Sequence, residues 1–248
     1  MKIKLKKLRR RIRTFLSDKP EVYIPLARIL KGDFIVNKKT EIVIEGYPRS
    51  GNSFAEAAFR FSQTRPVRIA HHSHAAAQVR AGAHWHIPTI VLLREPEEAV
   101  RSLMMHHPQL FDAKMAFHEY LIFYNGILPL RESFILAKFE TVTHDFGAII
   151  DAVNTAFSTQ FHPFQHTQEN EVCVFKEVNR LSRLRQTVDE KGEPYSLLRP
   201  KHERRERERQ KKAVQQILEN NLLRDDSLRM LKEKSVELYR NLVTTADV

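Results

Sequence analysis

The sequence predicts a three-layer α/β domain with a central, mostly parallel sheet and a helical C-terminal part. Short apolar runs at residues 41–45, 67–70, 88–94 and 134–139 alternate with helical patterns, as in βαβ units. The third run, PTIVLLR, is almost wholly apolar, which is typical of a strand that is covered on both faces. A glycine-containing turn, GYPRSG, directly follows the first run and cannot continue it as a strand.

The helices are predicted from their periodicity and from their first residues. Residues 53–62 and 145–157 have helical patterns, and a helix begins near Pro96, which suits a first turn. Residues 112–126 also have a helical pattern, and their aromatic side chains are expected to lie mainly in the core. From about residue 165 the chain is helical and charged, with helices expected at 201–219 and 224–242.

The length and composition restrict the class of protein. A chain of 248 residues, 42% hydrophobic, can form one sizeable core in one or two domains. No apolar run approaches the ~20 residues of a membrane helix, and no secretory signal is evident. The single cysteine, Cys173, cannot form an intrachain disulfide, which fits a reducing compartment. We therefore expect a cytoplasmic protein.

Positive charge is concentrated at the N-terminus. The net charge is +11, and the first 13 residues, MKIKLKKLRRRIR, hold eight Lys and Arg and no acid. Residues 1–17 are predicted to form a basic N-terminal arm or helix, and residues 38–248 a single α/β domain. The arm could be solvated or could contact a membrane surface peripherally, and we expect no nucleic-acid partner.

The turn after the first strand has the frame of a phosphate-binding loop. Gly46 and Gly51 are separated by four residues, and Ser53 follows near the start of a helix. A Walker A loop has lysine directly after the second glycine, where this chain has Asn52. Arg49 supplies the cation instead. Backbone N–H groups and the helix dipole can bind an anion here, so the domain is expected to be P-loop-like.

The side chains of this loop add further donors. Ser50, Asn52 and Ser53 can donate hydrogen bonds to an anion, and Gly51 lets the backbone approach it. The spacing alone also fits an ordinary strand-to-helix turn.

A second pair of polar residues follows the strand at 88–94. Arg94 ends this strand, and Ser102 lies eight residues later in the second turn of the next helix. The carboxyl ends of strands in an open α/β sheet form its ligand crevice. Each residue taken singly also fits a surface position, but two anion-binding elements after two strands indicate a site.

These segments resemble the sulfotransferase family. YPRSGNSF resembles the loop that binds the 5′-phosphosulfate of the donor, and IVLLREPEEAVRS resembles the element that binds its 3′-phosphate. FILAKFETVTHDF resembles the next strand of that family, with Phe139 in place of the usual tyrosine. The resemblance covers about residues 40–160, and the C-terminal third matches weakly.

The resemblance implies a co-substrate, 3′-phosphoadenosine-5′-phosphosulfate (PAPS), with no metal required. The sulfuryl group would pass to an acceptor hydroxyl or amine on a small molecule, lipid or saccharide. Arg49 would stabilise the leaving oxygen, together with the loop from Ser50 to Ser53. Arg94 and Ser102 would hold the 3′-phosphate, and Phe54 would stack on adenine.

A histidine is the implied general base, because an attacking hydroxyl must lose a proton. In RIAHHSHAAAQ, the family pattern selects His74, whereas the family spacing from Arg94 points nearer to His72. His71 is expected to be a polar surface residue. His-x-His pairs can bind Zn²⁺, but no four-ligand spacing is present, so no metal is expected.

The resemblance has a gap near the C-terminus. The family's third donor element, Arg-Lys-Gly, is absent, and LLRPKHERR is the nearest basic segment. Its candidate cations are Arg199, Lys201, Arg204 and Arg205, each of which also fits a charged helix start.

Two other functions fit parts of the sequence. A P-loop-type nucleotide or small-molecule kinase with a degenerate Walker A loop would bind Mg-ATP, although the missing lysine disfavours it. A non-enzymatic protein that binds membrane or nucleic acid would act through the basic arm, with strong salt dependence.

Overall fold

The computed structural model describes residues 2–186 and 201–248 and contains one parallel four-stranded sheet. The strand order is β2-β1-β3-β4, and all three strand pairs are parallel. The strands are β1 (Ile42–Gly46), β2 (Ile69–His71), β3 (Thr89–Leu93) and β4 (Ile135–Lys138). The predicted α/β class with a parallel sheet is confirmed.

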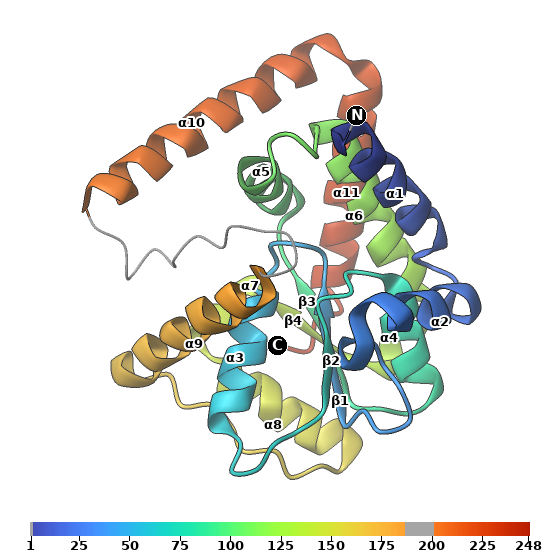
Figure 1. Cartoon of the computed structure of the whole chain (residues 1–248), viewed down its shortest axis with the longest axis vertical. Helices are drawn as coiled ribbons and strands as arrows, with labels where there is room; N and C mark the ends of the chain where they lie inside the picture. Colours follow the sequence, from blue (N-terminus) through green and yellow to red (C-terminus); the bar gives the residue numbers. More distant parts are fainter. Residues whose placement is uncertain (1, 187–200) are drawn as a thin grey trace.

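Helices cover both faces of the sheet (Figure 1). On one face lie α3 (Asn52–Ser62), α7 (Phe139–His144), α8 (Phe146–Phe157) and α9 (Gln168–Gln186). The other side holds α1 (Lys2–Leu16), α2 (Pro20–Lys31), α4 (Ala76–His84), α5 (Pro96–His106), α6 (Ala113–Ile127), α10 (Lys201–Arg224) and α11 (Asp226–Val243). Two short 3-10 helices are η1 (Gly32–Phe34) and η2 (Leu128–Ser133).

Alternate side chains of the central strands pack into different cores. Ile44, Ile90 and Leu92 face the core formed with α3 and α8, whereas Val91 and Leu93 face the core formed with α6. All of these side chains are fully buried. Burial on both faces explains why the strands are continuous apolar runs rather than alternating ones.

Three helices were not predicted, each for a physical reason. α2 contains Pro25, a residue that normally interrupts a helix. α4 has Val79 as its one large apolar side chain, so it lacks helical periodicity and is held by buried alanines. α7 begins at Phe139, where the sequence predicted the end of a strand.

The last two residues lie beside β4 and extend its pairing. The backbone N–H of Asp247 donates to the oxygen of Leu136, and that of Lys138 donates to the oxygen of Val248. Across residues 2–186 and 201–248, no helix has both the length and the apolar character needed to cross a membrane.

Gly46 at the end of β1 is fixed by its close approach to β3. A Cβ at this position would lie 2.7 Å from the backbone oxygen of Leu92, whereas a Cβ at Gly32 would meet nothing within 4 Å. We expect Gly46→Ala to lower the free energy of unfolding by about 3 kcal/mol in equilibrium urea denaturation. Gly32→Ala, the control, meets no atom but is strained by its φ of 54° and ψ of −126°, so it should cost less, about 2 kcal/mol. Equal losses in the two variants would contradict this steric account.

Candidate active site

The loop between β1 and α3 has the strand–turn–helix geometry of a phosphate-binding loop. Gly51 adopts a left-handed conformation with φ of 95°, and Arg49 also has a positive φ, of 71°. The side-chain amide of Asn52 donates to the backbone oxygen of Tyr47 at 3.0 Å and closes the loop. A Cβ on Gly51 would lie 3.2 Å from Val142, so glycine is favoured there by both conformation and space.

The two polar motifs of the sequence meet at one point. Nη1 of Arg94, directly after β3, donates to the backbone oxygen of Arg49 at 2.9 Å. Nε of Arg49 donates to the hydroxyl of Ser102 on α5 at 3.1 Å. Residues that are far apart in the sequence thus form a single cluster at the carboxyl end of the sheet.

This cluster carries an excess of positive charge. Nη2 of Arg94 binds Glu98 at 2.9 Å, and the same carboxylate also binds Arg101. Burial lowers the pKa of Arg94 from its usual value, with the charge of Arg49 acting in the same direction. No ion pair involving Arg49 is found in the described part of the chain. Arg49 and Arg94 are partly buried guanidinium groups, and the carboxylate that pairs with Arg94 is shared with Arg101, so the cluster suits an anionic ligand.

Aromatic residues fix Arg94 from two sides. Its guanidinium lies over the ring of Phe139, 4.1 Å from the centroid. The hydroxyl of Tyr120 donates to the backbone oxygen of Arg94 at 2.8 Å, and that of Tyr124 donates to Leu92 at 2.7 Å. The two tyrosines were not predicted as site residues. Their i, i+4 spacing places them on one face of α6, which is the signal that could have identified them.

The predicted donors of the loop differ in accessibility. Ser50 is 0% exposed and Asn52 is 5% exposed, so these side chains are enclosed by protein in this conformation. Ser53 is partly exposed, and its hydroxyl lies 3.1 Å from Nε2 of His72. Phe54 is buried and packs against Phe164, His166 and Phe175, so its ring faces the core rather than a ligand.

His74 lies behind the loop with one ring nitrogen fixed. Its Nδ1 is 2.9 Å from the backbone oxygen of Gly46, which requires a proton on Nδ1 and leaves Nε2 as an acceptor. Burial lowers the pKa of His74 well below its ordinary value, and Lys31 adds to this effect. His74 is therefore neutral at pH 7 with Nε2 as its acceptor nitrogen, and the lowered pKa makes it a weaker base than a free imidazole.

A small cavity adjoins His74. Its volume is about 10 Å³, which is room for about one water molecule. It is lined by Arg13, Thr14 and Ser17 from the N-terminal segment, by Tyr47, Pro48 and His74, and by Glu119 and Phe123 from α6.

The carboxylate of Glu45 positions the turn that carries His74. It accepts hydrogen bonds from the backbone N–H groups of Ser73 and His74, at 2.5 and 3.0 Å, and from the side chain of Gln78 at 2.8 Å. Burial raises the pKa of Glu45 to about 7, although the hydrogen bonds from the Ser73 and His74 backbone act to lower it. The clue in the sequence was a lone acid at the end of an apolar strand.

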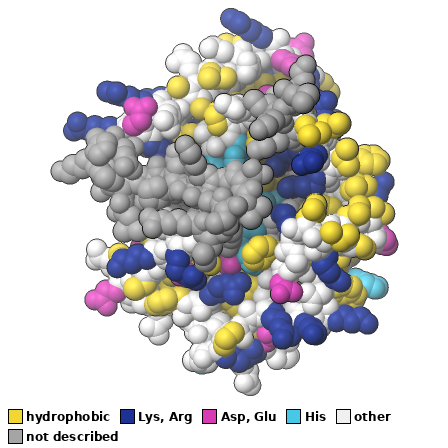
Figure 2. Space-filling model, in the orientation of Figure 1, with side chains coloured by type: hydrophobic (Ala, Val, Ile, Leu, Met, Phe, Trp, Pro, Cys, Tyr) yellow, Lys and Arg dark blue, Asp and Glu magenta, His cyan; other side chains and the backbone are white. Residues whose placement is uncertain are grey.

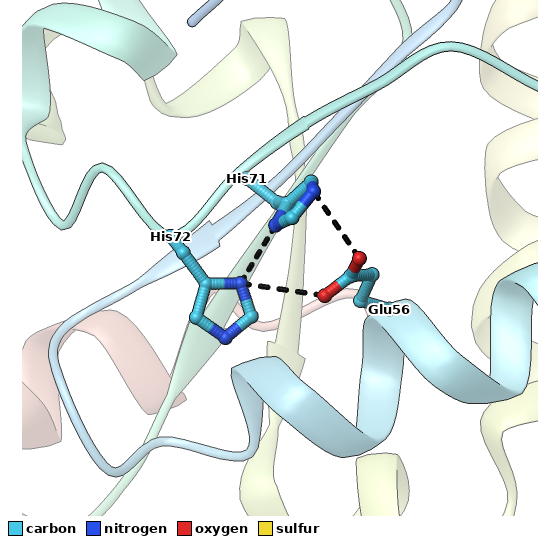
Figure 3. A group of neighbouring side chains, drawn as sticks. All are labelled: Glu56, His71 and His72. Carbon is cyan, nitrogen blue, oxygen red and sulfur yellow. Dashed lines mark hydrogen bonds and ion pairs between the residues drawn. The ribbon is translucent and has the colours of Figure 1, made fainter. Parts of the chain in front are cut away.

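His72 belongs to a chain of polar side chains (Figure 3). Nδ1 of His72 lies 2.7 Å from Nδ1 of His71, and Nε2 of His71 lies 3.2 Å from Oε1 of Glu56. Glu56 also lies 3.5 Å from Nδ1 of His72, so both rings face the same carboxylate. A proton assignment compatible with the two hydrogen bonds has His72 donating to His71 and the Ser53 hydroxyl donating to His72. His72 would then hold an acceptor nitrogen at the loop.

The prediction that His71 is a surface residue is wrong. His71 is 1% exposed, because it ends β2 and packs against Glu56 of α3 and the ring of Phe34. Ligand atoms of Glu56, His71 and His72 lie within 4.8 Å of one another, a spacing that could hold a metal ion. The same side chains also contact one another and Ser53 directly.

Most side chains of the basic segment near residue 200 lie outside what the structure describes. Arg199 lies outside the described residues, and the described side chains do not include those of Lys201 and Arg204. Arg205, in α10, is exposed.

Comparisons with known proteins give one structural similarity. No family model matches the chain, and no curated protein matches it. Among solved structures, a mouse sulfotransferase, SULT7A1, in complex with PAP is similar with 11% sequence identity and a TM-score of 0.38. The similarity covers 82% of this chain and 91% of that chain. These values do not assign the chain to a family.

The raised pKa of Glu45 predicts a measurable titration. In carbon-13 NMR of labelled glutamate, the Glu45 carboxyl should titrate with a midpoint of about 7, against 4.5 for an ordinary glutamate. Because the folded-state pKa is raised, the contribution of Glu45 to stability is fully present below pH 4.5 and is lost as pH rises through 7. Its total is about 3 kcal/mol.

Glu45→Gln provides the assignment control for this titration. The signal near pH 7 should disappear in the variant, and its unfolding free energy should lack the corresponding decline with pH. A midpoint near 4.5 in the wild-type protein would contradict the account of burial.

Proposed function

We propose that this protein is a sulfotransferase that transfers the sulfuryl group of PAPS to an acceptor hydroxyl or amine. The observation that carries the proposal is the convergence of Arg49, Arg94 and Ser102, which come from two separate motifs. By the sequence resemblance, one motif would bind the 5′-phosphosulfate and the other the 3′-phosphate of the same donor molecule, so the two motifs must lie side by side. The hydrogen bonds from Arg49 to Ser102 and from Arg94 to Arg49 hold them side by side.

The donor would occupy both anion-binding elements. The loop amides up to Gly51 and the start of α3 would bind the 5′-phosphosulfate, helped by the helix dipole. Arg49 would stabilise the negative charge that develops on the bridging oxygen. Arg94 and Ser102 would bind the 3′-phosphate, which would then replace part of the present contact with Glu98.

The proposed sulfuryl transfer is a direct displacement at sulfur that involves no metal. The acceptor oxygen or nitrogen forms a bond to sulfur while the bond between sulfur and the bridging oxygen breaks. The proton of the acceptor passes to Nε2 of His74, and the products are the sulfated acceptor and 3′-phosphoadenosine 5′-phosphate (PAP). His74 suits this role because Gly46 fixes its Nδ1 proton, which leaves Nε2 as the acceptor nitrogen, and because the residue lines the cavity.

The size of the cavity constrains the acceptor. Because it holds about one water molecule, an acceptor that enters it must displace some of the side chains that line it, among them those of Arg13 and Thr14 in the first helix. We therefore propose that the first helix borders the acceptor site, whether the acceptor is a small molecule, a lipid or a saccharide.

The alternative base is His72, whose Nε2 lies against Ser53. A kinase is less well supported by the loop. The residue in the place of the Walker lysine is Asn52, and its amide turns back to Tyr47 instead of extending toward a triphosphate.

Two asparagine variants distinguish the histidines. His72 and His74 both have positive φ, a conformation that asparagine tolerates, and its amide can replace the Nδ1 donor but not the Nε2 acceptor. We expect His74→Asn to slow transfer of labelled sulfate from PAPS by about 100-fold or more, with PAP binding unchanged. Transfer should be measured to water and to a panel of phenols, aliphatic alcohols and amines.

His72→Asn is the matched variant and should slow transfer less than His74→Asn. The reverse order would assign the base to His72. If neither variant slows transfer, neither His72 nor His74 acts as the base. If the wild-type protein neither transfers sulfate nor binds PAP, the proposed function is wrong.

A further inference from the structure

The outer surface of α1 and α2 exposes an unusual number of large apolar side chains. Figure 2 shows hydrophobic side chains gathered over these two helices, with Lys and Arg among them. On α2, Ile29 is 82% exposed and Leu30 is 86% exposed. The other exposed members of this outer face are Leu5, Leu8, Ile12, Phe15, Val22 and Leu26.

The spacing places these side chains on a single face of each helix. In α1, Leu5, Leu8, Ile12 and Phe15 recur at intervals of three and four residues. Large apolar side chains scattered singly are normal on a protein surface, whereas a contiguous group of this kind marks an interaction site.

The opposite side of α1 already holds the helix to the protein. Arg10 binds Glu119 of α6 at 2.7 Å, and its guanidinium lies over the ring of Phe111. The hydroxyl of Thr14 donates to Glu119 at 3.0 Å, and the backbone N–H of Ala77 donates to Ser17. The outer face is therefore not needed to attach α1 to the domain.

Charge identifies the partner that suits this face. The first 35 residues hold eleven Lys and Arg against three acids, and the first acid is Asp18. A second copy of the chain would bring the same cations together, which is unfavourable. A nucleic acid would pair with the cations but leave the apolar rows in water. An anionic bilayer can interact with both the cations and the apolar side chains, because its headgroups attract Lys and Arg and its interface accommodates Leu, Ile and Phe.

We propose that the outer face of α1 and α2 binds the surface of an anionic lipid bilayer. The helices lie in the plane of the interface rather than across it. The inference rests on the exposed side chains and the charge of this segment, and it does not depend on sulfuryl transfer.

Vesicle sedimentation of the full chain tests this proposal. The protein should sediment with phosphatidylcholine vesicles that contain about 30% phosphatidylglycerol and only weakly with pure phosphatidylcholine. Raising the salt from about 0.05 M to about 0.5 M should weaken but not abolish binding, since the apolar part is not screened. Leu8→Ser with Phe15→Ser, and separately Ile29→Ser with Leu30→Ser, should each lower the partition coefficient at least about tenfold.

The control is Ile217→Ser with Leu223→Ser, two exposed apolar side chains of α10. This variant should bind vesicles like the wild type, and circular dichroism should show that all variants are folded. Absence of binding to anionic vesicles at low salt would overturn the proposal. So would a concentration-dependent dimer that the α1 and α2 variants abolish, or equal binding of DNA and anionic vesicles that the serine variants leave unchanged.

Discussion

The hydrogen bond from Arg94 to the backbone oxygen of Arg49 is the contact on which the candidate site depends. It ties the end of β3 to the loop after β1, in a region where the two guanidinium groups repel each other. Glu98 offsets part of that charge, while Phe139 and Tyr120 hold Arg94 in place. The remaining positive charge is arranged before any anion arrives, which is the condition for strong electrostatic binding.

The sheet and the two anion-binding motifs could be predicted because they depend on local signals. Buried strands read as apolar runs, and the carboxyl ends of parallel strands meet at one edge, so Arg49 and Arg94 could be brought together from the sequence. The partners of buried polar groups could not be predicted from the sequence. His71 is buried because Glu56, fifteen positions earlier, lies on the facing side of α3. Such pairing depends on how helices pack, which the sequence pattern does not contain.

The first helix has two faces with different surroundings. Its inner side contacts Glu119 and closes the small cavity beside His74. Its outer side exposes apolar and basic groups. The charge of this segment is evident from the sequence, but the helix α2 that continues its apolar face is not, because Pro20 and Pro25 resemble interruptions.

Calorimetric titration with PAP, AMP and Mg-ATP tests the central claim most directly, since AMP lacks only the 3′-phosphate. If Arg94 and the loop bind two ends of one donor, PAP should bind at least about 100-fold more tightly than AMP. Arg94→Gln should remove most of this difference by deleting the 3′-phosphate contact, and it should weaken AMP binding to a smaller extent because the hydrogen bond to the Arg49 loop is also lost. Equal affinity for PAP and AMP, or tighter binding of Mg-ATP than of PAP, would contradict the account.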